Sequence, residues 1–478
     1  IIGLPANIFF GTGIPTIIMV LRQKRENTDV LIIDASKGFI KEGKNNKLRA
    51  SDIKRIADTF IKRESVLKFS RVVSREEIRS NDYNLNIPRY VDSSEAAEHW
   101  DVYASMFGGI PTAEIEELGE FWTAFPALKK ALFTESGIPY VNVSVDDIKS
   151  AIKSHPDVVG FEDAFNAAFS TFPAFLKEEL IDRMESIEIS KAETVLSADI
   201  FERLKDIPLI DKYAAFQLLD DDWTGISIDL EVLQTEGFSA TKEVDPNLVI
   251  KKKDGKDQEV QEGWVGHIIP FDLVQATLLS AETDELHGLE SRLAEIPSEY
   301  ESILDEMTEE DKESCNDVLT EEGDAFVPKE VSKKIKELKK DRSPESVALR
   351  TLLEKVESLI KSEKEIKAEI KAKSAALQAK TKDTIESLSD EQALDLLEKK
   401  WIAPLIESIH KLPDTVIDSL VSKIQALQNK YATTFFEVEQ QISETEATLS
   451  GMIEDLEGNE YDMLGLNELK KLLGGSAE

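Results

Sequence analysis

The chain has 478 residues, too many for one core, because single cores stop growing near about 250–300 residues. Its formal net charge of −36 argues against a protein that binds nucleic acid along its whole length. The charge is uneven, however. Residues 1–80 hold 16 Lys/Arg and 9 Asp/Glu, whereas the rest of the chain holds 41 and 84. One cysteine, Cys315, excludes an intrachain disulfide and favours the cytoplasm, and five scattered histidines predict no metal site.

The first 21 residues carry no charged side chain, and about 20 apolar residues would suffice to span a bilayer. Three glycines and two prolines would break such a helix, and no positively charged segment precedes the run as in a secretory signal. We therefore expect two buried strands, "IIGLP" and "TIIMVL", joined by a Gly-rich loop. A third strand, "DVLIID", and the helix "ASDIKRIADTFIKR" should follow. The neutral start is then expected to be the edge of a sheet whose other strands lie outside the printed sequence.

Residues 93–280 show a mixed α/β pattern. Helices are predicted over 112–133, 145–154 and 193–205, and strands in "ISIDLEVL" and "GWVGHIIPF". His267 stands alone among apolar neighbours, which favours a hydrogen-bonded core or edge histidine over a ligand or base.

Residues 281–388 have the spacing of a coiled-coil hairpin with an acidic linker. Apolar residues recur every three or four positions at Leu286, Leu289, Leu293, Ile296, Tyr300, Ile303 and Met307, and again through Leu352, Val356, Leu359, Ile366, Ile370 and Leu377. Pro297 predicts a kink in the first helix. The acidic connection 308–345 is expected to be partly disordered.

Residues 389–478 are predicted to be helical. "SDEQ" is a capping box in which Ser389 caps and Gln392 bonds back. Helices are expected over 390–411 and 415–456, broken at Leu412–Pro413 and ended by Gly458. Their apolar positions should face a core or a partner. These positions include Trp401, Leu405, Ile409, Leu420, Ile424 and Leu427.

No complete active site is visible in the sequence. "GTGIPT" lacks the third glycine of a dinucleotide fingerprint and precedes a strand rather than a helix. The chain has no GxxxxGK[ST] segment, no GxSxG elbow and no HExxH pair. We assign it no catalytic, cofactor-binding or metal-binding residue.

Three segments in order, "IIGLPANIFFGTGIPTIIMVLRQKR", "VLIIDASKGF" and "NDYNLNIPRYVD", resemble the carboxy-terminal strands of a known enzyme domain. That domain is the methyltransferase domain in the modification subunit of type I restriction-modification systems. Weaker similarity continues through "IPLIDKYAAFQLL", "GWVGHIIPFDLVQ" and the tail that begins "LEKKWIAPLIESIHKLPD".

The resemblance implies a DNA methyltransferase that moves a methyl group from S-adenosylmethionine to the N6 of an adenine turned out of the duplex. The family's cofactor loop and its Asn-Pro-Pro-aromatic tetrapeptide both lie upstream in the family and do not occur in this sequence. This chain alone is therefore expected to be inactive.

By the same resemblance, the loop "FFGTGIPT" lies where related enzymes place an aromatic residue that stacks on the flipped base. A flipped base needs such a surface, because it has lost its neighbours in the helix. The candidates are Phe9, Phe10, Gly11, Thr12 and Gly13, with Phe10 preferred because it adjoins Gly11. The alternative is that both phenylalanines belong to the core.

Lys44, Lys47 and Arg49 lie in "KGFIKEGKNNKLR", a segment with five positive side chains and one negative. Their charges could meet DNA phosphates, although a solvated loop is an equal alternative. "NDYNLNIPRY" is expected to be a structural lid, with no catalytic role for Tyr83, Arg89 or Tyr90.

The implied partners are double-stranded DNA, a specificity subunit and, in some complexes, a restriction subunit; no membrane contact is expected. The acidic helices beyond residue 281, above all 390–456, should dock on the specificity subunit. For the pair 286–307 and 352–377, an intramolecular bundle is favoured. The rival interpretation of the whole chain is a coiled-coil scaffold without enzymatic activity.

The predicted fold is thus α/β at the N-terminus, with terminal strands of a Rossmann-like domain, followed by a mostly α-helical region with a coiled-coil hairpin. The predicted domains are 1–92, 93–280, 281–388 and 389–478.

Overall fold

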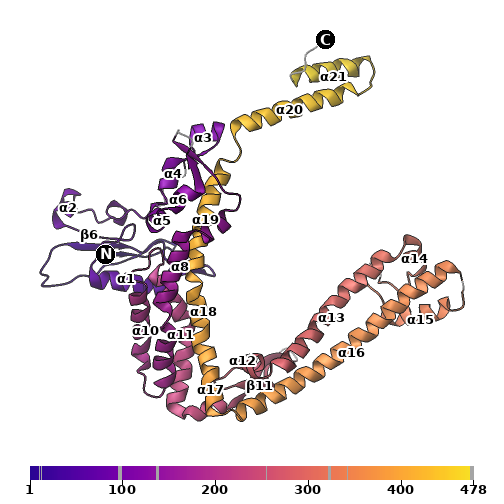
Figure 1. Ribbon diagram of the computed structural model, residues 1–478, viewed down its shortest axis with the longest axis horizontal. Coiled ribbons are helices and arrows are strands. Elements are labelled where there is room, and N and C mark those ends of the chain that lie inside the picture. Colours follow the sequence, from indigo (N-terminus) through magenta and orange to yellow (C-terminus); the bar gives the residue numbers. More distant parts are fainter. Residues whose placement is uncertain are drawn as a thin grey trace. The chain divides into compact units, whose positions relative to one another are not determined.

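The computed structural model describes residues 1–9, 11, 13–94, 99–135, 139–253, 256–320, 324–341 and 343–473 (Figure 1). Its contacts divide the chain into two compact units. Unit 1 contains residues 1–176, 188–225 and 404–478, and unit 2 contains residues 177–187 and 226–403.

Unit 1 begins with a four-stranded sheet in the order β2-β1-β3-β6. Its strands are β1 (Ile2–Gly3), β2 (Ile17–Ile18), β3 (Val30–Asp34) and β6 (Ser70–Val73). β1 runs parallel to β3 and antiparallel to β2, and β3 runs antiparallel to β6. The neutral start therefore forms two strands and a loop, as predicted, rather than a continuous helix. The prediction that both strands are buried is wrong for β2, whose residues are exposed because it lies at the edge of the sheet.

Both faces of this sheet are covered. On β3, Leu31 and Ile33 point to a core shared with α1 (Ala50–Lys62), whereas Ile32 points to the opposite core. The alternation follows from the two-residue period of a strand. The opposite core is closed by α2 (Arg75–Ser80) and by η1 (Ile87–Arg89) with the residues after it. The predicted lid "NDYNLNIPRY" therefore packs on the sheet.

The remaining part of unit 1 is mostly helical. Its shorter elements are the hairpin β4 (Ile40–Glu42) and β5 (Asn45–Lys47), α3 (Val102–Phe107), β7 (Ile110–Pro111), α4 (Thr112–Glu116), α5 (Gly119–Ala124), α6 (Leu128–Leu132), β8 (Phe133–Glu135) and β9 (Tyr140–Val143). Then follow α7 (Ile148–Lys153), α8 (Pro156–Phe169), α9 (Phe172–Leu176) and α10 (Ile189–Arg203). The helix predicted over 112–133 is thus three short helices.

One apolar core joins distant parts of the sequence in unit 1. α19 (Leu412–Lys430) buries Ile417, Leu420 and Ile424 against residues from 110 to 161, among them Phe125 and Leu128. Trp401, Leu405 and Ile409 are also fully buried. Most of the apolar positions predicted in this region therefore face the protein's own core rather than a partner.

α11 (Lys212–Glu236) corrects one prediction. The segment "ISIDLEVL", predicted as a strand, is the C-terminal part of this helix. Its buried residues Ile226, Leu230 and Leu233 are spaced by four and three, which is the helical period.

Unit 2 contains the two-stranded ribbon β10 (Val244–Lys253) and β11 (Lys256–Gly266), with η3 (Phe238–Lys242) before it and α12 (Phe271–Leu278) after it. "GWVG" lies in β11 as predicted, but the following "HIIPF" leaves the strand. α13 (Ser280–Glu306) and α16 (Pro344–Glu386) then pack side by side as an antiparallel hairpin, called the arm below (Figure 1). α13 continues through Pro297 as one helix.

The connection between these two helices is folded where the structure describes it. α14 (Glu309–Ser314) and α15 (Pro328–Leu338) share a core with the arm that includes Cys315, Val331 and Leu353. The expectation of partial disorder is therefore wrong for α14 and α15, because these helices bury enough apolar surface to be held in place.

Unit 2 closes with η2 (Lys177–Asp182), α17 (Asp390–Leu397) and η4 (Glu398–Ile402), where η2 and η4 are π-helical. The predicted capping box of Ser389 and Gln392 is present. Next to η4, the carboxylate of buried Asp229 accepts hydrogen bonds from Lys400 and from the Trp401 indole.

Unit 1 ends with α18 (Ala403–His410), α19, α20 (Phe435–Glu454) and α21 (Glu460–Leu472). The helix predicted over 415–456 is therefore two helices, divided at residues 431–434. Thr434 and Glu437 form a capping box at the start of α20, which explains why a new helix begins there. Among the described residues, no helix is both long and apolar enough to cross a membrane.

Candidate functional site

The candidate site is the loop between β1 and β2, called the base loop below and covering residues 5–16. It is closed at its foot by the pairing of Ile2 with Ile18 and by the hydrogen bond from the Leu4 amide to the Thr16 carbonyl, 2.8 Å long. The loop turns back between the two strands, and glycine permits the positive φ angles that such a turn uses and that other residues avoid. Gly11 has a φ of 75° and open space around it.

Phe9 is the aromatic residue of this loop whose position is described. Its side chain is 56% exposed, so it does not belong to a core. An exposed phenyl ring offers a flat apolar face on which a planar base can stack. Gly11 and Gly13 follow in the same loop, whereas Phe10 and Thr12 lie outside the described residues.

The hairpin β4–β5 holds the base loop in place. The Asn46 side chain donates to the Ala6 carbonyl at 2.7 Å, and its backbone amide donates to the Asn7 carbonyl at 2.9 Å. Asn7 itself has a φ of 55°, a left-handed conformation that asparagine tolerates. Asn46 is not among the residues predicted for the site, although asparagine next to a Gly-containing turn is a common signal for such local bonding.

The three phosphate candidates lie on or just after this hairpin, but their side chains have different surroundings. Lys44 is exposed beside the Gly43 turn. Lys47 is exposed too, although it pairs with Glu42 at 3.0 Å. Arg49 binds the Asp52 carboxylate through Nε at 2.9 Å and Nη2 at 3.0 Å, and this bonding raises the pKa of Arg49.

Arg49 therefore has a structural partner at the start of α1. The nearby cations Lys54 and Arg55 also lie over aromatic rings, those of Phe201 and Tyr213 among others. Lys44 is consequently the one of the three candidates that pairs with no carboxylate in the described part of the chain.

A second set of contacts fixes the carboxyl end of β3. Asp34 is buried and accepts hydrogen bonds from the Ser36 amide at 3.0 Å and the Ser93 hydroxyl at 2.5 Å. The Tyr90 hydroxyl donates to the Asn84 carbonyl, and Tyr90 is buried. The bond from Ser93 ties the segment 81–94 to the sheet and occupies the Asp34 carboxylate, and the bond from Tyr90 holds the segment itself together. Both bonds fit a structural role for the segment.

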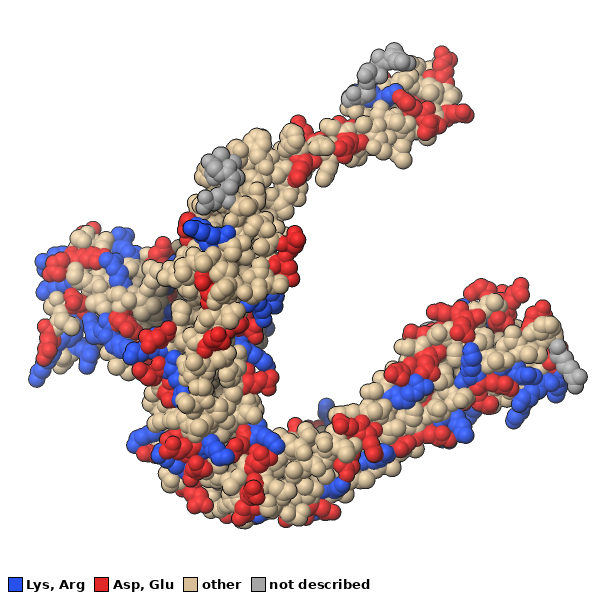
Figure 2. Space-filling model, in the orientation of Figure 1, with Lys and Arg blue, Asp and Glu red and all other residues tan. Residues whose placement is uncertain are grey.

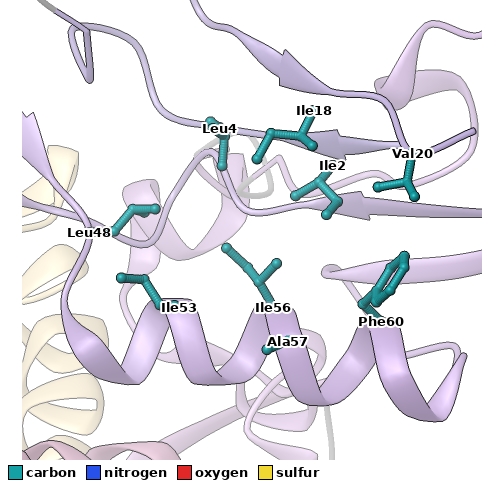
Figure 3. A pocket seen from close by; sticks show the side chains of 9 residues that line it. All are labelled: Ile2, Leu4, Ile18, Val20, Leu48, Ile53, Ile56, Ala57 and Phe60. Atoms are coloured by element: carbon teal, nitrogen blue, oxygen red, sulfur yellow. The ribbon is translucent and has the colours of Figure 1, made fainter.

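A cavity of about 360 Å³ lies between β1, β2 and α1 (Figure 3). Ile53, Ile56 and Phe60 of α1 point across it toward Ile2 and Ile18 of the strands. The lining side chains are all apolar, so they could neither transfer a proton nor bind a charged amino-acid group.

S-adenosylmethionine carries a sulfonium, an ammonium and a carboxylate, which need polar partners. The cavity supplies none, and Asp34 is already satisfied by two serines. The described residues around the sheet therefore do not fit this cofactor.

The described residues contain no group of three or more His, Cys, Asp or Glu side chains placed to hold a metal ion. His267 pairs with Asp245 through Nδ1 at 2.6 Å and with Glu236 through Nε2 at 3.1 Å. It is therefore a hydrogen-bonded edge histidine, as expected.

Residues 1–99 match the family model described as "N-6 DNA Methylase". Among curated proteins, the chain is 37% identical over 103 residues to the type I restriction enzyme MpnII methylase subunit of Mycoplasma pneumoniae, covering 21% of this chain and 19% of that protein. It is 37% identical over 128 residues to the MjaVII methylase subunit of Methanocaldococcus jannaschii, covering 25% and 22%. The resemblance predicted from the sequence motifs is confirmed for this segment.

Among solved structures, the chain matches the type I restriction-modification methyltransferase subunit of Streptococcus thermophilus. The identity is 52%, the match covers 20% of each chain, and the TM-score is 0.19. The chain thus matches only about a fifth of the length of each of these relatives.

Proposed function

We propose that this chain, whose first 99 residues match the N-6 DNA methylase family model, forms part of the DNA-methylating subunit of a type I restriction-modification system. The reaction is methyl transfer from S-adenosylmethionine to the N6 of adenine in double-stranded DNA. The family match over residues 1–99 is the observation that carries the proposal. No feature of the described structure favours the scaffold alternative.

Within this reaction, the base loop grips the flipped adenine. Phe9 supports this role because its ring is exposed on a loop that Asn46 holds at two carbonyl groups. A loop backbone that is held in place before the base arrives loses little conformational freedom on binding. Phe10 and Thr12 share the loop and belong to the same proposal, and Lys44 is the proposed phosphate contact beside it.

The methyl donor and the catalytic tetrapeptide are supplied by other elements of the methylase subunit. Two observations support this assignment: the described residues around the sheet do not fit S-adenosylmethionine, and the sequence contains no Asn-Pro-Pro-aromatic segment. Tests of the proposal therefore use the whole methylase subunit with its specificity subunit.

The test replaces Phe9 by alanine, and Phe10 by alanine in a second variant, within that complex. Stacking of a base on an aromatic ring contributes about 1–3 kcal/mol. We expect kcat/KM for methyl transfer to fall about tenfold or more, with an unchanged Tm, because an exposed ring contributes little to stability.

Phe107→Ala is the matched control. Phe107 is similarly exposed, at 61%, but lies on α3 away from the base loop in sequence, and it should leave kcat/KM unchanged. Normal turnover in both loop variants would refute the base-gripping role. A fall in Tm that parallels the fall in activity would show that the rings are structural.

We further propose that α20 docks on the specificity subunit. Phe435, Val438, Ile442, Leu449 and Met452, with Leu456 just beyond the helix, form a line of exposed apolar side chains called the α20 stripe below. Their spacing of three and four residues, interrupted once at Thr445, is that of a helix that packs against another helix.

The structure supports a narrower docking surface than the predicted 390–456. The apolar face of α19 is buried in the core of unit 1, whereas the α20 stripe is exposed. The chain just before α20 is fixed, because Lys430 pairs with Glu114 at 2.9 Å and the Tyr431 hydroxyl also bonds Glu114.

A further inference from the structure

α15, near the far end of the arm, carries a row of exposed lysines on one side, whereas its Lys334 is half-buried and pairs with Asp317. Lys329 and Lys336 are seven residues apart and Lys340 follows four later, so the three lie on the same side of the helix and the turn after it. Val331 and Ile335 point the opposite way, into the core shared with α16. Lys329, Lys336, Lys339 and Lys340 are all exposed and are called the α15 lysines below.

These four neighbouring lysines have no acidic partner among the described residues, and Lys364 and Lys371, which stand singly on α16, have none either. Most other lysines of the arm and of the helices α14 and α15 form ion pairs. The pairs are Lys312–Glu309, Lys333–Glu330, Lys334–Asp317, Lys355–Glu306, Lys361–Glu365, Lys367–Glu363, Lys373–Glu285, Lys380–Glu282 and Lys382–Glu386. Within the described part of the chain, no carboxylate pairs with any α15 lysine. Their charge is therefore available to an external anion.

Helix stability accounts for only part of this arrangement, because the dipole favours Lys336, Lys339 and Lys340 at the C-terminal end of α15 but not Lys329. Lys329 lies in the first turn of α15, next to Pro328, where the helix dipole disfavours a positive charge. Acidic residues gather instead on α14, whose first turn contains Glu309, Glu310 and Asp311. Figure 2 shows the result as red side chains over α14 and blue ones over α15.

The arm places these lysines far from the base of unit 2. α16 has 43 residues, which corresponds to a length of about 65 Å at 1.5 Å per residue. The lysines occur near its far end, in a chain whose net charge is −36. A basic surface spaced in this way can meet a polyanion without bringing the acidic body against it.

We propose that the α15 lysines bind the phosphate backbone of duplex DNA outside the methylated site. The proposal rests on the proposed function, which makes DNA the substrate. Exposed lysines recognise phosphate as point charges, so the contact is independent of base sequence and weakens with salt. Its role is to retain the DNA, rather than to select or modify a base.

The test replaces all four α15 lysines by glutamine in the complex of methylase and specificity subunits. Glutamine keeps helix propensity close to that of lysine, so the Tm should not change. Binding to a target duplex and to a random duplex should weaken equally. Each lost phosphate contact removes about 0.9 from the slope of log K against log salt, so the slope should become about 2–4 shallower.

The control variant replaces Lys355, Lys361, Lys367 and Lys380 by glutamine. These four lysines are exposed on α16, each pairs with a carboxylate, and their loss changes the net charge equally. We expect an unchanged slope for this variant. An equal effect in both variants would overturn the proposal, because net charge rather than the α15 surface would then act.

Two other results would also overturn it. Unchanged DNA binding by the α15 variant, in a complex that still methylates DNA, would exclude the contact and leave the proposed function intact. Loss of the specificity subunit from the variant complex would show that the lysines bind protein. A wild-type complex that neither binds nor methylates DNA would instead refute both the proposed function and this contact.

Discussion

Single side chains show where sequence reasoning about this protein ends. The sequence places Phe9 beside glycines but does not say whether its ring is buried, since that depends on what packs over the loop. It places Arg49 in a basic segment but does not reveal that Asp52, three residues later, binds the guanidinium at two points. Tertiary geometry decides which carboxylate a long, positively charged side chain pairs with. A positive charge in the sequence therefore predicts phosphate binding less well than a positive side chain that the structure shows to be unpaired.

His267 links three segments of unit 2 and gives a pH-dependent prediction. The hydrogen bond with Asp245 raises the pKa of His267 and outweighs the lowering caused by burial. A raised folded pKa means that the protonated histidine stabilises the fold. This stabilisation is fully present below the unfolded pKa of about 6.5 and is lost as the pH rises through the folded pKa.

His267→Gln should therefore lower the Tm more at pH 6 than at pH 9, as measured by thermal unfolding across that range. His287→Gln is the control, because His287 is exposed on α13 and should shift the Tm little at either pH. An equal loss of Tm at both pH values for the His267 variant would show that its charge is not involved.

At the scale of whole elements, the patterns that repeat over many residues were predictive. The spacing of apolar residues located α13 and α16, and Ser389 with Gln392 marked the start of α17. The segment 226–233 was wrongly predicted as a strand because three of its eight residues are isoleucine or valine, which favour strands. It is helical because it continues the long helix α11 that begins at Lys212. The break at 431–434 was missed although Thr434 and Glu437 carry a capping-box signal.

α20 yields the prediction for partner binding. Ile442→Lys places a charge in the middle of the α20 stripe and should weaken binding to the specificity subunit by about 2 kcal/mol, or about 30-fold in Kd. Gln441→Lys is its control, because it adds the same charge on the neighbouring exposed position. Co-purification and titration calorimetry measure both. Equal affinity of the two variants would remove the α20 stripe from the interface.

Deletion of all residues after 388 would also remove α20, but its effect on binding to the specificity subunit would be harder to interpret. α17 and α19 contribute buried residues to the protein's own cores, among them Leu396, Ile417 and Leu420. Their deletion would damage the fold and so would not report on docking alone. Substitutions in α20 avoid this difficulty, because the α20 stripe is exposed.

At the scale of the whole molecule, charge separates the expected tasks. Residues 1–80 are basic and include the base loop, whereas the remaining chain is strongly acidic and mostly helical. We assign DNA contact to the basic part and to the α15 lysines, and protein contact to α20. The family match covers residues 1–99. The roles that we propose for the helical residues after it therefore depend on their exposed surfaces rather than on resemblance.

Methylation of adenine in DNA can be measured on the product itself. The complete methylase subunit that contains this chain is purified with its specificity subunit and incubated with duplex DNA and S-adenosylmethionine carrying a labelled methyl group. The DNA is then digested to nucleosides and analysed by mass spectrometry. We expect labelled N6-methyladenine, formed far more slowly by the Phe9→Ala and Phe10→Ala variants. If the DNA carries no label, or carries it on cytosine in place of adenine, the proposed function is wrong.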